Sequence, residues 1–406
     1  MRPRLLVLNQ YYRPGMEATA NLLAQLCEEL AADHEVTVVT GRLHGYPDLP
    51  DEEILAGVHV VRVPSTSFDR TRLPLRAVNY LTYLTGSLLR AGRERRPDVV
   101  LCLTDPPMIG DVGLLVARRF RAPLVVVTED VFPEIAVRVG RLSNPVVVGL
   151  LRRLVDLYLR RADRVVTIGE TMRRRIESRG VRPERVAVIE NWVDTAAITP
   201  RRRPNAWSAA HGLGGRFVVM HSGNIGHAHD LATLVRAATF LRDLEDLRIL
   251  IVGFGALRAD TMRLAERLEV DSVEFFEYQP REALSESLSS ADLHYVGLAS
   301  GLAGLVVPSR VYGILAAGRP LLVSADAESE TAELARREGC GVVVPPGRPE
   351  LVAAAIRRAH AGELALDEMG ARGRAYVTRE ADRSVAFARY RSLLAPLAGA
   401  ASSRER

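Results

Sequence analysis

Short apolar runs, many of them β-branched, alternate with helical stretches through the first half of the chain. Helical periodicity separates several of these runs, most clearly over residues 19–31, 109–120 and 172–179. Near-continuous apolar strands that alternate with helices predict a parallel sheet covered on both faces, as in a Rossmann-like domain. The predicted strands of this half are 5–8, 35–39, 59–63, 99–103, 124–128, 164–168 and 186–190.

A second series of the same kind fills the other half and predicts a second doubly wound domain. Its predicted strands are 216–220, 248–252, 273–275, 293–296, 320–323 and 341–344. In open α/β sheets the ligand site lies outside the carboxyl ends of the strands, so we expect the two domains to face a central cleft. The expected fold class is therefore α/β, with two Rossmann-like doubly wound domains.

The boundary between the two series is marked by residues 198–205, which hold two prolines and three arginines and so suit an exposed linker. We therefore expect an N-terminal domain over residues 1–197, a linker over 198–206 and a C-terminal domain over 207–378. Residues 379–396 are predicted to form a helix that packs back on the first domain, and residues 397–406 to form a disordered tail.

Composition agrees with two cores, because the chain has 406 residues and is 48% hydrophobic. No apolar run approaches the roughly 20 residues that span a bilayer, and the first residues do not form a signal sequence, so a cytoplasmic protein is expected. The three cysteines, Cys27, Cys102 and Cys340, are far apart and show no metal-ligand spacing.

The two halves of the chain differ in net charge. Residues 1–203 hold 31 arginines against 24 acidic residues, whereas the remainder holds 23 against 25. The basic surplus of the first half suits an anionic membrane surface or a phosphate-bearing ligand, and a solvated surface explains it equally simply. Nucleic acid is not an expected partner, because no binding motif appears and aromatic residues make up only 5% of the chain.

The loop at residues 221–230 follows a predicted strand and leads into a helix. Gly223 and Gly226, on either side of Asn224 and Ile225, allow the backbone to approach an anion closely, and the helix that follows offers free N–H groups. A diphosphate site and an ordinary strand-to-helix turn remain equally open for this loop. The next strand ends at Gly253 and Gly255, but Arg258 breaks the dinucleotide-binding fingerprint.

Further candidates follow the later strands of the second half. Tyr278 and Gln279 come after the third strand, and Pro308, Ser309 and Arg310 open a helix. A cation near the positive end of a helix dipole is unfavourable unless it binds an anion, so Arg310 is predicted to contact phosphate.

The first half offers carboxylates at the same positions relative to its strands. Gly15 and Glu17 follow the first strand, and Asp130 and Glu134 follow the strand 124–128. These side chains could orient sugar hydroxyls. For Glu134, compensation of a helix dipole is an equally good reason for its place.

Taken together, these segments resemble glycosyltransferase family 4, within it the bacterial subgroup similar to fucosamine and colanic-acid-type exopolysaccharide transferases. The resemblance spans nearly the whole chain through residues 9–14 (NQYYRP), 129–134 (EDVFPE), 189–194 (IENWVD), 223–226 (GNIG), 308–320 (PSRVYGILAAGRP) and 339–347. It implies a GT-B fold, retention of anomeric configuration, no obligatory metal and a UDP-sugar donor. It also implies that the N-terminal domain 1–197 lies on the acceptor side and that the C-terminal domain 207–378 binds the nucleotide-sugar. No cofactor is expected apart from this nucleotide-sugar substrate.

The sequence departs from the broad family pattern at four positions. Asn224 and His229 stand where many members carry arginine and lysine, and Leu305 and Gly313 stand where two glutamates are usual. The subgroup's Pro-Ser-Lys is Pro-Ser-Arg here, so the resemblance gives the phosphate charge to Arg310. Glu330 is the candidate for the ribose.

The resulting hypothesis is transfer of a hexosyl or N-acetylhexosaminyl group from a UDP-sugar to an acceptor hydroxyl. Arg310 and the N–H groups of 223–226 would stabilise the departing diphosphate, and Asp130 would contact the donor sugar or orient the acceptor. The resemblance implies a lipid-linked or polysaccharide acceptor met at the inner face of the cell membrane. The basic amphipathic segments 150–161 and 72–96 could lie on such a surface, although packing of their apolar faces on the sheet explains their periodicity as well.

Three alternatives remain open: a UDP-sugar 2-epimerase of the same fold, a transferase acting on a soluble metabolite, and a small-molecule binding protein that turns nothing over. Acceptor-dependent release of UDP would separate transferase from epimerase.

Overall fold

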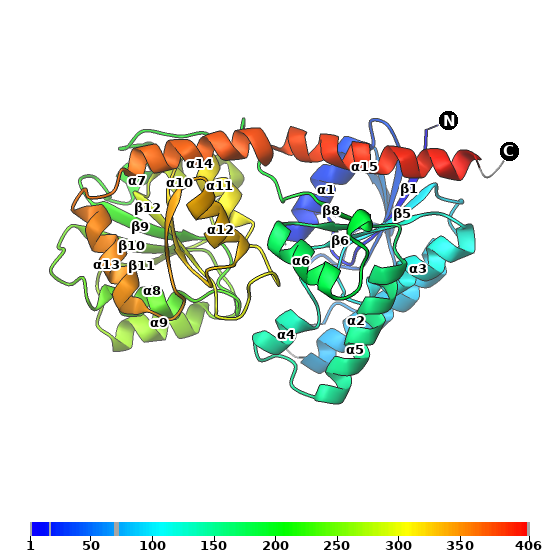
Figure 1. The fold of residues 1–406 in the computed structure, drawn as a ribbon, viewed down its shortest axis with the longest axis horizontal. Coiled ribbons are helices and arrows are strands. Elements are labelled where there is room, and N and C mark those ends of the chain that lie inside the picture. Colours follow the sequence, from blue (N-terminus) through cyan, green and yellow to red (C-terminus); the bar gives the residue numbers. More distant parts are fainter. Residues whose placement is uncertain (1, 16–17, 69–72, 404–406) are drawn as a thin grey trace. The chain divides into compact units, whose positions relative to one another are not determined.

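The computed structural model describes residues 2–15, 18–68 and 73–403. The chain divides into two compact units. Unit 1 comprises Met1–Glu190 together with Ala386–Arg406, and unit 2 comprises Asn191–Val385. Each unit is an α/β sandwich built on its own sheet (Figure 1).

Unit 1 contains, among its described residues, an eight-stranded sheet in the order β3-β4-β2-β1-β5-β6-β7-β8. Figure 1 shows α2, α3 and α5 together on one face of this sheet, in agreement with the contacts of α3 with both other helices. The strands are β1 (Arg4–Leu8), β2 (Glu35–Thr40), β3 (Glu52–Leu55), β4 (Val58–Arg62), β5 (Val99–Cys102), β6 (Leu124–Thr128), β7 (Arg164–Thr167) and β8 (Val186–Val188). The helices are α1 (Ala18–Leu30), α2 (Leu73–Ala91), α3 (Ile109–Phe120), α4 (Glu134–Arg138), α5 (Pro145–Arg161), α6 (Glu170–Ser178), a 3-10 turn (Pro183–Arg185) and most of α15 (Arg383–Ser403).

One strand of this sheet, β3, is not predicted by the apolar pattern. It is an edge strand that pairs antiparallel with β4, whereas the other pairings are parallel. Glu52 and Glu53 give it no apolar run, and Ile54 is exposed. Ala56 and Gly57, both with positive φ, form the tight reversal that makes the hairpin.

Unit 2 contains, within its described residues, a six-stranded parallel sheet in the order β11-β10-β9-β12-β13-β14. The strands are β9 (Phe217–Ser222), β10 (Leu247–Val252), β11 (Val273–Phe276), β12 (Leu293–Gly297), β13 (Leu321–Ser324) and β14 (Gly341–Val344). The helices are α7 (Ala206–Ala210), α8 (Leu231–Ala238), α9 (Arg258–Arg267), a 3-10 turn (Arg281–Ala283), α10 (Leu284–Ser289), α11 (Arg310–Ala316), α12 (Glu330–Arg337), α13 (Pro349–His360) and α14 (Leu366–Glu380).

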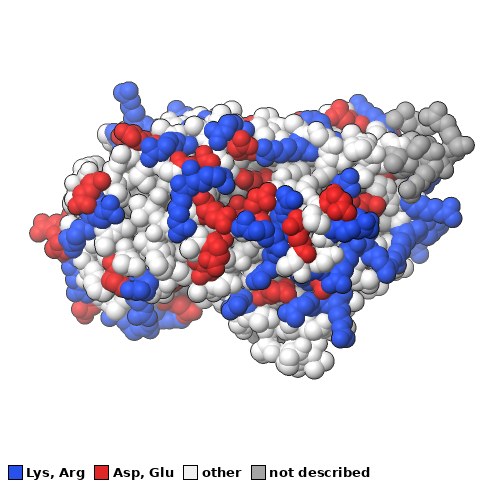
Figure 2. Space-filling view, viewed as in Figure 1, with Lys and Arg blue, Asp and Glu red and all other residues white. Residues whose placement is uncertain are grey.

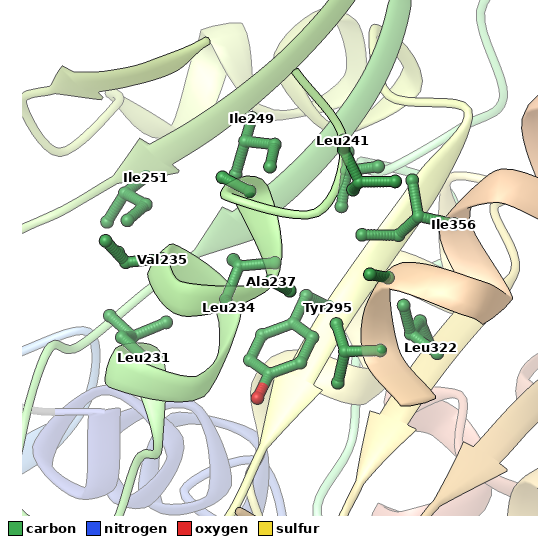
Figure 3. Packing of buried hydrophobic residues seen from close by; sticks show 14 of the residues in the cluster. Leu231, Leu234, Val235, Ala237, Leu241, Ile249, Ile251, Tyr295, Leu322 and Ile356 are labelled. Carbon is green, nitrogen blue, oxygen red and sulfur yellow. The ribbon is translucent and has the colours of Figure 1, made fainter. Parts of the chain in front are cut away.

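The core of unit 2 lies where α8 and α13 cover the sheet (Figure 3). Leu234 and Val235 of α8 pack on Ile249 and Ile251 of β10, and all four are fully buried. The hydroxyl of Tyr295 leaves this core and donates to the carbonyl of Asp230 at 2.8 Å. The core therefore fixes the loop that joins β9 to α8, which is one of the candidate site loops.

The predicted linker is not a free tether. Within unit 2 the backbone N–H of Thr199 donates to Ser285 Oγ at 3.1 Å and that of Arg201 to Ser289 Oγ at 2.9 Å. Arg374 donates to the carbonyls of Thr195 and Ile198, each at 2.7 Å. Buried hydroxyls of α10 and an arginine of α14 thus hold this segment to unit 2, which begins at Asn191.

The C-terminal helix differs from the prediction in its length. Helix α15 runs Arg383–Ser403, so the described part of the tail that the sequence predicts to be disordered is helical. The alanine-rich sequence favours a helix, and Leu394 and Ala398 are buried. From Ala386 onward this helix belongs to unit 1, where Arg391 pairs with Glu29 and Asp33. Among the described residues, no helix combines the length and the apolar character needed to cross a bilayer.

Candidate functional site

Two glycine-bearing loops meet at the carboxyl edge of the sheet of unit 2. Gly223 follows β9 and Gly253 follows β10, and both have positive φ. A Cβ added to Gly253 would lie 2.0 Å from the carbonyl oxygen of Gly223. Only glycine permits this approach, so the two loops form one continuous backbone surface.

Hydrogen bonds hold the same two loops together. The N–H of Ile225 donates to the carbonyl of Phe254 at 3.0 Å, and the N–H of Leu257 donates to the carbonyl of Ile225 at 3.0 Å. Asn224 lies against Gly226 and Gly255, where added Cβ atoms would be 3.0 and 2.6 Å from its amide group. Gly255 is required by packing, because an added Cβ would also lie 2.5 Å from the backbone oxygen of Ile225.

Arg310, the first residue of α11, lies against the first of these loops. A Cβ on Gly223 would be 3.4 Å from Arg310 Cδ. The Nε and Nη2 atoms of Arg310 are buried and have no hydrogen-bond partner among the described residues. Burial lowers the pKa of this guanidinium to about 10, so it still carries a positive charge at neutral pH.

Two histidines surround this charge in place of a carboxylate. Nη1 of Arg310 lies 3.2 Å from Nε2 of His229, and the rings of His229 and His221 are 6.1 Å apart. Burial first, and then the positive charge of Arg310, lower the pKa of both histidines well below the ordinary value. Both rings are therefore neutral at pH 7 and leave the charge of Arg310 uncompensated.

A buried cation without a counter-charge costs free energy, and an anion that reaches it regains that energy. The arrangement is therefore suited to binding phosphate oxygens, with a planar guanidinium as the donor. Among the described residues no group of three or more His, Cys, Asp and Glu side chains could hold a metal ion.

One expectation for this loop needs correction. The sequence suggests that the N-terminus of α8 offers free N–H groups to an anion. Instead Asp230 caps the helix, because its Oδ1 accepts from the N–H of Thr233 at 3.1 Å and its Oδ2 accepts from Thr233 Oγ1 at 2.5 Å. A carboxylate already occupies this helix end, so Arg310 is the main cationic group of the site.

The other predicted donor-side residues of unit 2 differ in their burial and contacts. Pro308 is buried and Ser309 half-buried immediately before it. Tyr278 is half exposed and meets Phe254 of the second glycine loop edge to face at 5.9 Å. Gln279 is occupied elsewhere, because its Oε1 accepts from Trp207 Nε1 at 2.8 Å. Glu330 is buried in the first turn of α12.

Unit 1 has its own cluster at the carboxyl edge of its sheet. Asp130 follows β6 and is open to solvent, but protein atoms crowd around it. This crowding, and then the charges of Asp105 and Glu129, raise the pKa of Asp130 to about 7, and Arg76 opposes the shift. Arg76 donates to the hydroxyl of Tyr80 at 2.6 Å. The cluster offers carboxylates and a phenol to a hydroxyl-rich ligand.

The remaining predictions in unit 1 have mixed outcomes. Glu134 is paired with Arg152 Nε at 2.8 Å and with Arg179 Nη1 at 3.4 Å, so its carboxylate is already engaged. Gly15 closes a turn through its N–H to the carbonyl of Tyr12 at 2.9 Å. Glu17 lies outside the described residues.

Four contributors were not named from the sequence as site residues: His221 and His229 in unit 2, and Arg76 and Asp105 in unit 1. His221 is the fifth residue of β9, so the end of the strand pattern could have drawn attention to it. Arg76 lies on α2, far from β6 in sequence, and no local signal connects the two.

The sequence and the fold of this chain resemble those of known glycosyltransferases. A family described as "Glycosyl transferase 4-like domain" matches residues 17–192, and one described as "Glycosyl transferases group 1" matches residues 205–376. "Putative colanic acid biosynthesis glycosyl transferase WcaI" of Escherichia coli (strain K12) is 28% identical over 404 residues, covering 94% of this chain and 97% of the relative. "Probable glycosyltransferase WbjE" of Pseudomonas aeruginosa is 26% identical, covering 77% of this chain and 78% of the relative.

A solved structure, Alr3699/HepE of Anabaena in complex with UDP and glucose, superposes with a TM-score of 0.76 at 15% identity. The match covers 97% of this chain and all of that chain. It shows that the chain, with its two Rossmann-like units, has the GT-B fold.

The two matched regions and the fold thus define a nucleotide-sugar-dependent glycosyltransferase. The chain belongs to glycosyltransferase family 4.

Proposed function

We propose that this chain is a retaining, metal-independent transferase that moves a hexosyl or N-acetylhexosaminyl group from a UDP-sugar to an acceptor hydroxyl. The observation that carries the proposal is the guanidinium of Arg310, which lies beside Gly223 with Nε and Nη2 buried and, among the described residues, without a carboxylate partner. Bond cleavage in a UDP-sugar places negative charge on the diphosphate, and a cation fixed in advance stabilises that charge.

The preference for uridine rests on likeness. The Anabaena structure of the same fold holds UDP. The family that the sequence resembles usually takes a UDP-sugar as donor. The half-exposed pair Phe254 and Tyr278 offers aromatic faces beside the glycine loops. We propose Gly223, Asn224, Gly226 and Gly253 as the surface for the diphosphate, with Pro308 and Ser309 placing Arg310.

Glu330 remains our candidate for the ribose hydroxyls. We propose that Gln279 holds its loop to Trp207 and does not contact the donor through its side chain.

In unit 1 we propose that Asp130 orients the acceptor or the transferred sugar, with Gly15 and Glu17 on the same acceptor side. Glu134, engaged by two arginines, is proposed to hold the loop after β6 in place.

The acceptor is proposed to be a lipid-linked or polysaccharide precursor at the inner face of the cell membrane. The likeness to a colanic acid biosynthesis transferase supports this proposal. Helix α5 adds an exposed stripe of Val146, Leu150 and Leu157, which are 79%, 57% and 42% exposed. The sequence pattern is equally explained by inward packing, but these three side chains do not pack inward. Figure 2 shows an uncharged patch flanked by basic side chains at the end of unit 1 where α4 and α5 lie in Figure 1.

The proposal is tested by thermal unfolding with UDP, GDP, ADP and NAD, each in the presence of EDTA. A ligand that binds only the folded state raises the melting temperature, so UDP should give the largest shift. A larger shift with GDP would contradict the uridine preference, and loss of the UDP shift in EDTA would contradict metal independence. Release of UDP only when an acceptor is added would then exclude the epimerase.

A further inference from the structure

Unit 2 contains a second basic site, at the edge of its sheet opposite to Arg310. A cavity of about 710 Å³ is lined by Arg201, Arg202, Arg203 and Arg319, with Asp292 and Asp367 also in its wall. We call it the arginine pocket. Asp292 immediately precedes β12 and Arg319 lies two residues before β13, so the pocket lies at the amino ends of parallel strands.

The arginine pocket is separate from the proposed donor site. Gly223 follows the carboxyl end of β9, whereas Gly215 of the pocket wall precedes its amino end. At about 3.3 Å per residue, the six residues of β9 separate the two edges by roughly 20 Å. A diphosphate bound at Arg310 cannot also reach the arginine pocket.

One ion pair in the pocket belongs to the fold. Arg203 Nη1 lies 2.5 Å from Asp292 Oδ2, and Arg203 Nη2 donates to the carbonyl of Arg216 at 2.5 Å. Asp292 also accepts from the N–H of Val218 at 2.7 Å. This pair ties the connecting segment to β9 and β12, and it leaves Arg201, Arg202 and Arg319 facing one exposed carboxylate, Asp367.

The three remaining arginines are short of partners. Within the described residues, no ion pair or hydrogen bond engages the guanidinium groups of Arg201 and Arg202. Arg319 donates from Nη2 to the carbonyl of Arg201 at 3.3 Å, but its Nε is buried without a partner. Burial lowers the pKa of Arg319. The charge of Arg203 lowers it further, whereas the charges of Asp292 and Asp367 raise it.

The backbone that carries these arginines is held in advance. Arg201 is anchored through its N–H to Ser289 Oγ at 2.9 Å. A Cβ on Gly318 would be 3.1 Å from Pro200 Cγ, so the two walls of the pocket touch. Ordering of the segment therefore adds little entropic cost when a ligand binds.

We infer that the arginine pocket binds an anion carrying more than one phosphate group, in addition to the nucleotide-sugar of the proposed function. Arginine is the side chain best suited to this task, because its planar guanidinium presents paired N–H groups to phosphate oxygens. An exposed arginine cluster needs no ligand when each member is solvated. Arg319 differs, because water does not reach its Nε.

Titration calorimetry of sodium pyrophosphate into the full-length chain tests the inference. Arg310→Met is the starting protein, because it removes the cation of the donor site. We expect Arg310→Met to bind one pyrophosphate. Adding both Arg202→Ser and Arg319→Met to this protein should lower its affinity for pyrophosphate tenfold or more. Arg267→Ser, at an exposed arginine of α9 with no ion pair among the described residues, is the matched control and should leave the affinity unchanged.

Absence of binding in Arg310→Met, or equal binding after the pocket substitutions, would overturn the inference without affecting the proposed function. Arg202→Ser alone keeps the test valid if Arg319→Met unfolds, because the Arg202 guanidinium makes no ion pair or hydrogen bond with the residues that the structure describes. This single variant should still weaken binding several-fold. Vesicles containing cardiolipin, whose headgroup carries two phosphates, distinguish two sources of the phosphate. If the double variant also loses vesicle binding, the ligand is a lipid headgroup, and if it keeps vesicle binding, the ligand is a free anion.

Discussion

Arg310 combines a positive charge and buried Nε and Nη2 atoms with the lack of a carboxylate partner among the described residues, and this combination affects stability. The guanidinium has lost water at Nε and Nη2, and these atoms gain no hydrogen bond from the described part of the chain. Replacement of such a group by an apolar side chain of similar length is often neutral or stabilising. Sites of this kind exchange stability for function.

We therefore predict that Arg310→Met leaves the free energy of unfolding unchanged or raises it by about 1 kcal/mol. Transfer should fall at least roughly 100-fold, as expected when a charge-stabilising donor is removed. Thermal unfolding and initial-rate kinetics check both values, with Arg267→Met as the control that changes neither. Near-normal kcat, or loss of stability in parallel with activity, would argue against this role.

The second prediction concerns Asp130, whose pKa is raised to about 7 by crowding and by Asp105 and Glu129. Because the raised pKa belongs to an acid, the carboxylate forms as pH increases from 6 to 8. If the carboxylate orients the acceptor, transfer should rise over this range in the native protein and be low and flat in Asp130→Asn. UDP affinity should change little, because the proposed donor groups lie in unit 2.

Rates measured across this pH range, together with calorimetry of UDP, check this prediction. Glu134→Gln is a useful comparison, since loss of its pairs with Arg152 and Arg179 should lower stability and leave the pH profile in place. A parallel fall of UDP affinity in Asp130→Asn would show that the division of roles between the units is wrong.

At the scale of elements, the strands were largely predictable because a parallel strand buried on both faces is an uninterrupted apolar run. Strands β6 and β14 have the predicted bounds, and most others differ by one or two residues. β3 was missed because an exposed edge strand is not apolar, and its pairing depends on the turn at Ala56 and Gly57.

The candidate site was less predictable, because its properties arise from contacts between distant segments. The glycine loops and Arg310 follow strands or begin helices, so their positions could be inferred from order along the chain. That Arg310 lacks a carboxylate, and that Trp207 engages Gln279 across 72 residues, depends on packing that no local pattern encodes.

Helix α5 carries an exposed apolar stripe. Val146, Leu150, Arg153 and Leu157 recur at helical spacing and form one exposed stripe. Each leucine inserted into a membrane interface contributes about 1.5 kcal/mol to binding, and a nearby arginine adds about 1 kcal/mol on an anionic leaflet. We expect Leu150→Ser with Leu157→Ser to lower binding to phosphatidylglycerol vesicles at least tenfold.

Sedimentation with anionic and neutral vesicles, at low and high salt, measures this effect. Phe240→Ser, which removes an exposed aromatic residue of unit 2, is the matched control. Unchanged sedimentation of the α5 variant, with efficient transfer to a water-soluble acceptor, would favour a soluble metabolite as acceptor.

At the scale of the whole molecule, the two units differ in how the chain builds them. Unit 1 is discontinuous, because it needs Ala386–Arg406 as well as Met1–Glu190. Phe387, Tyr390 and Leu394 of that segment are buried, so their removal would expose apolar surface. Unit 2 is continuous, and its two ends are joined by a bridge between Val193 and Asp382.

The last prediction follows from this difference. The fragment 191–385 contains every donor-side group proposed here, and its ends are closed by hydrogen bonds from Val193 N–H to the Ala381 carbonyl and from Arg383 N–H to the Val193 carbonyl, each at 3.0 Å. We expect it to unfold cooperatively and to bind UDP within about threefold of the full-length affinity, or about 0.6 kcal/mol, while catalysing no transfer because Asp130 is missing.

The fragment 1–190 should unfold at a lower temperature than the full chain, since it lacks α15. Circular dichroism and calorimetry with UDP measure these properties. Arg310→Met in the 191–385 fragment is the control that should abolish UDP binding at the donor site, with Arg202→Ser and Arg319→Met added to remove diphosphate binding by the arginine pocket. A cooperatively folded fragment that fails to bind UDP would show that donor binding requires residues of unit 1.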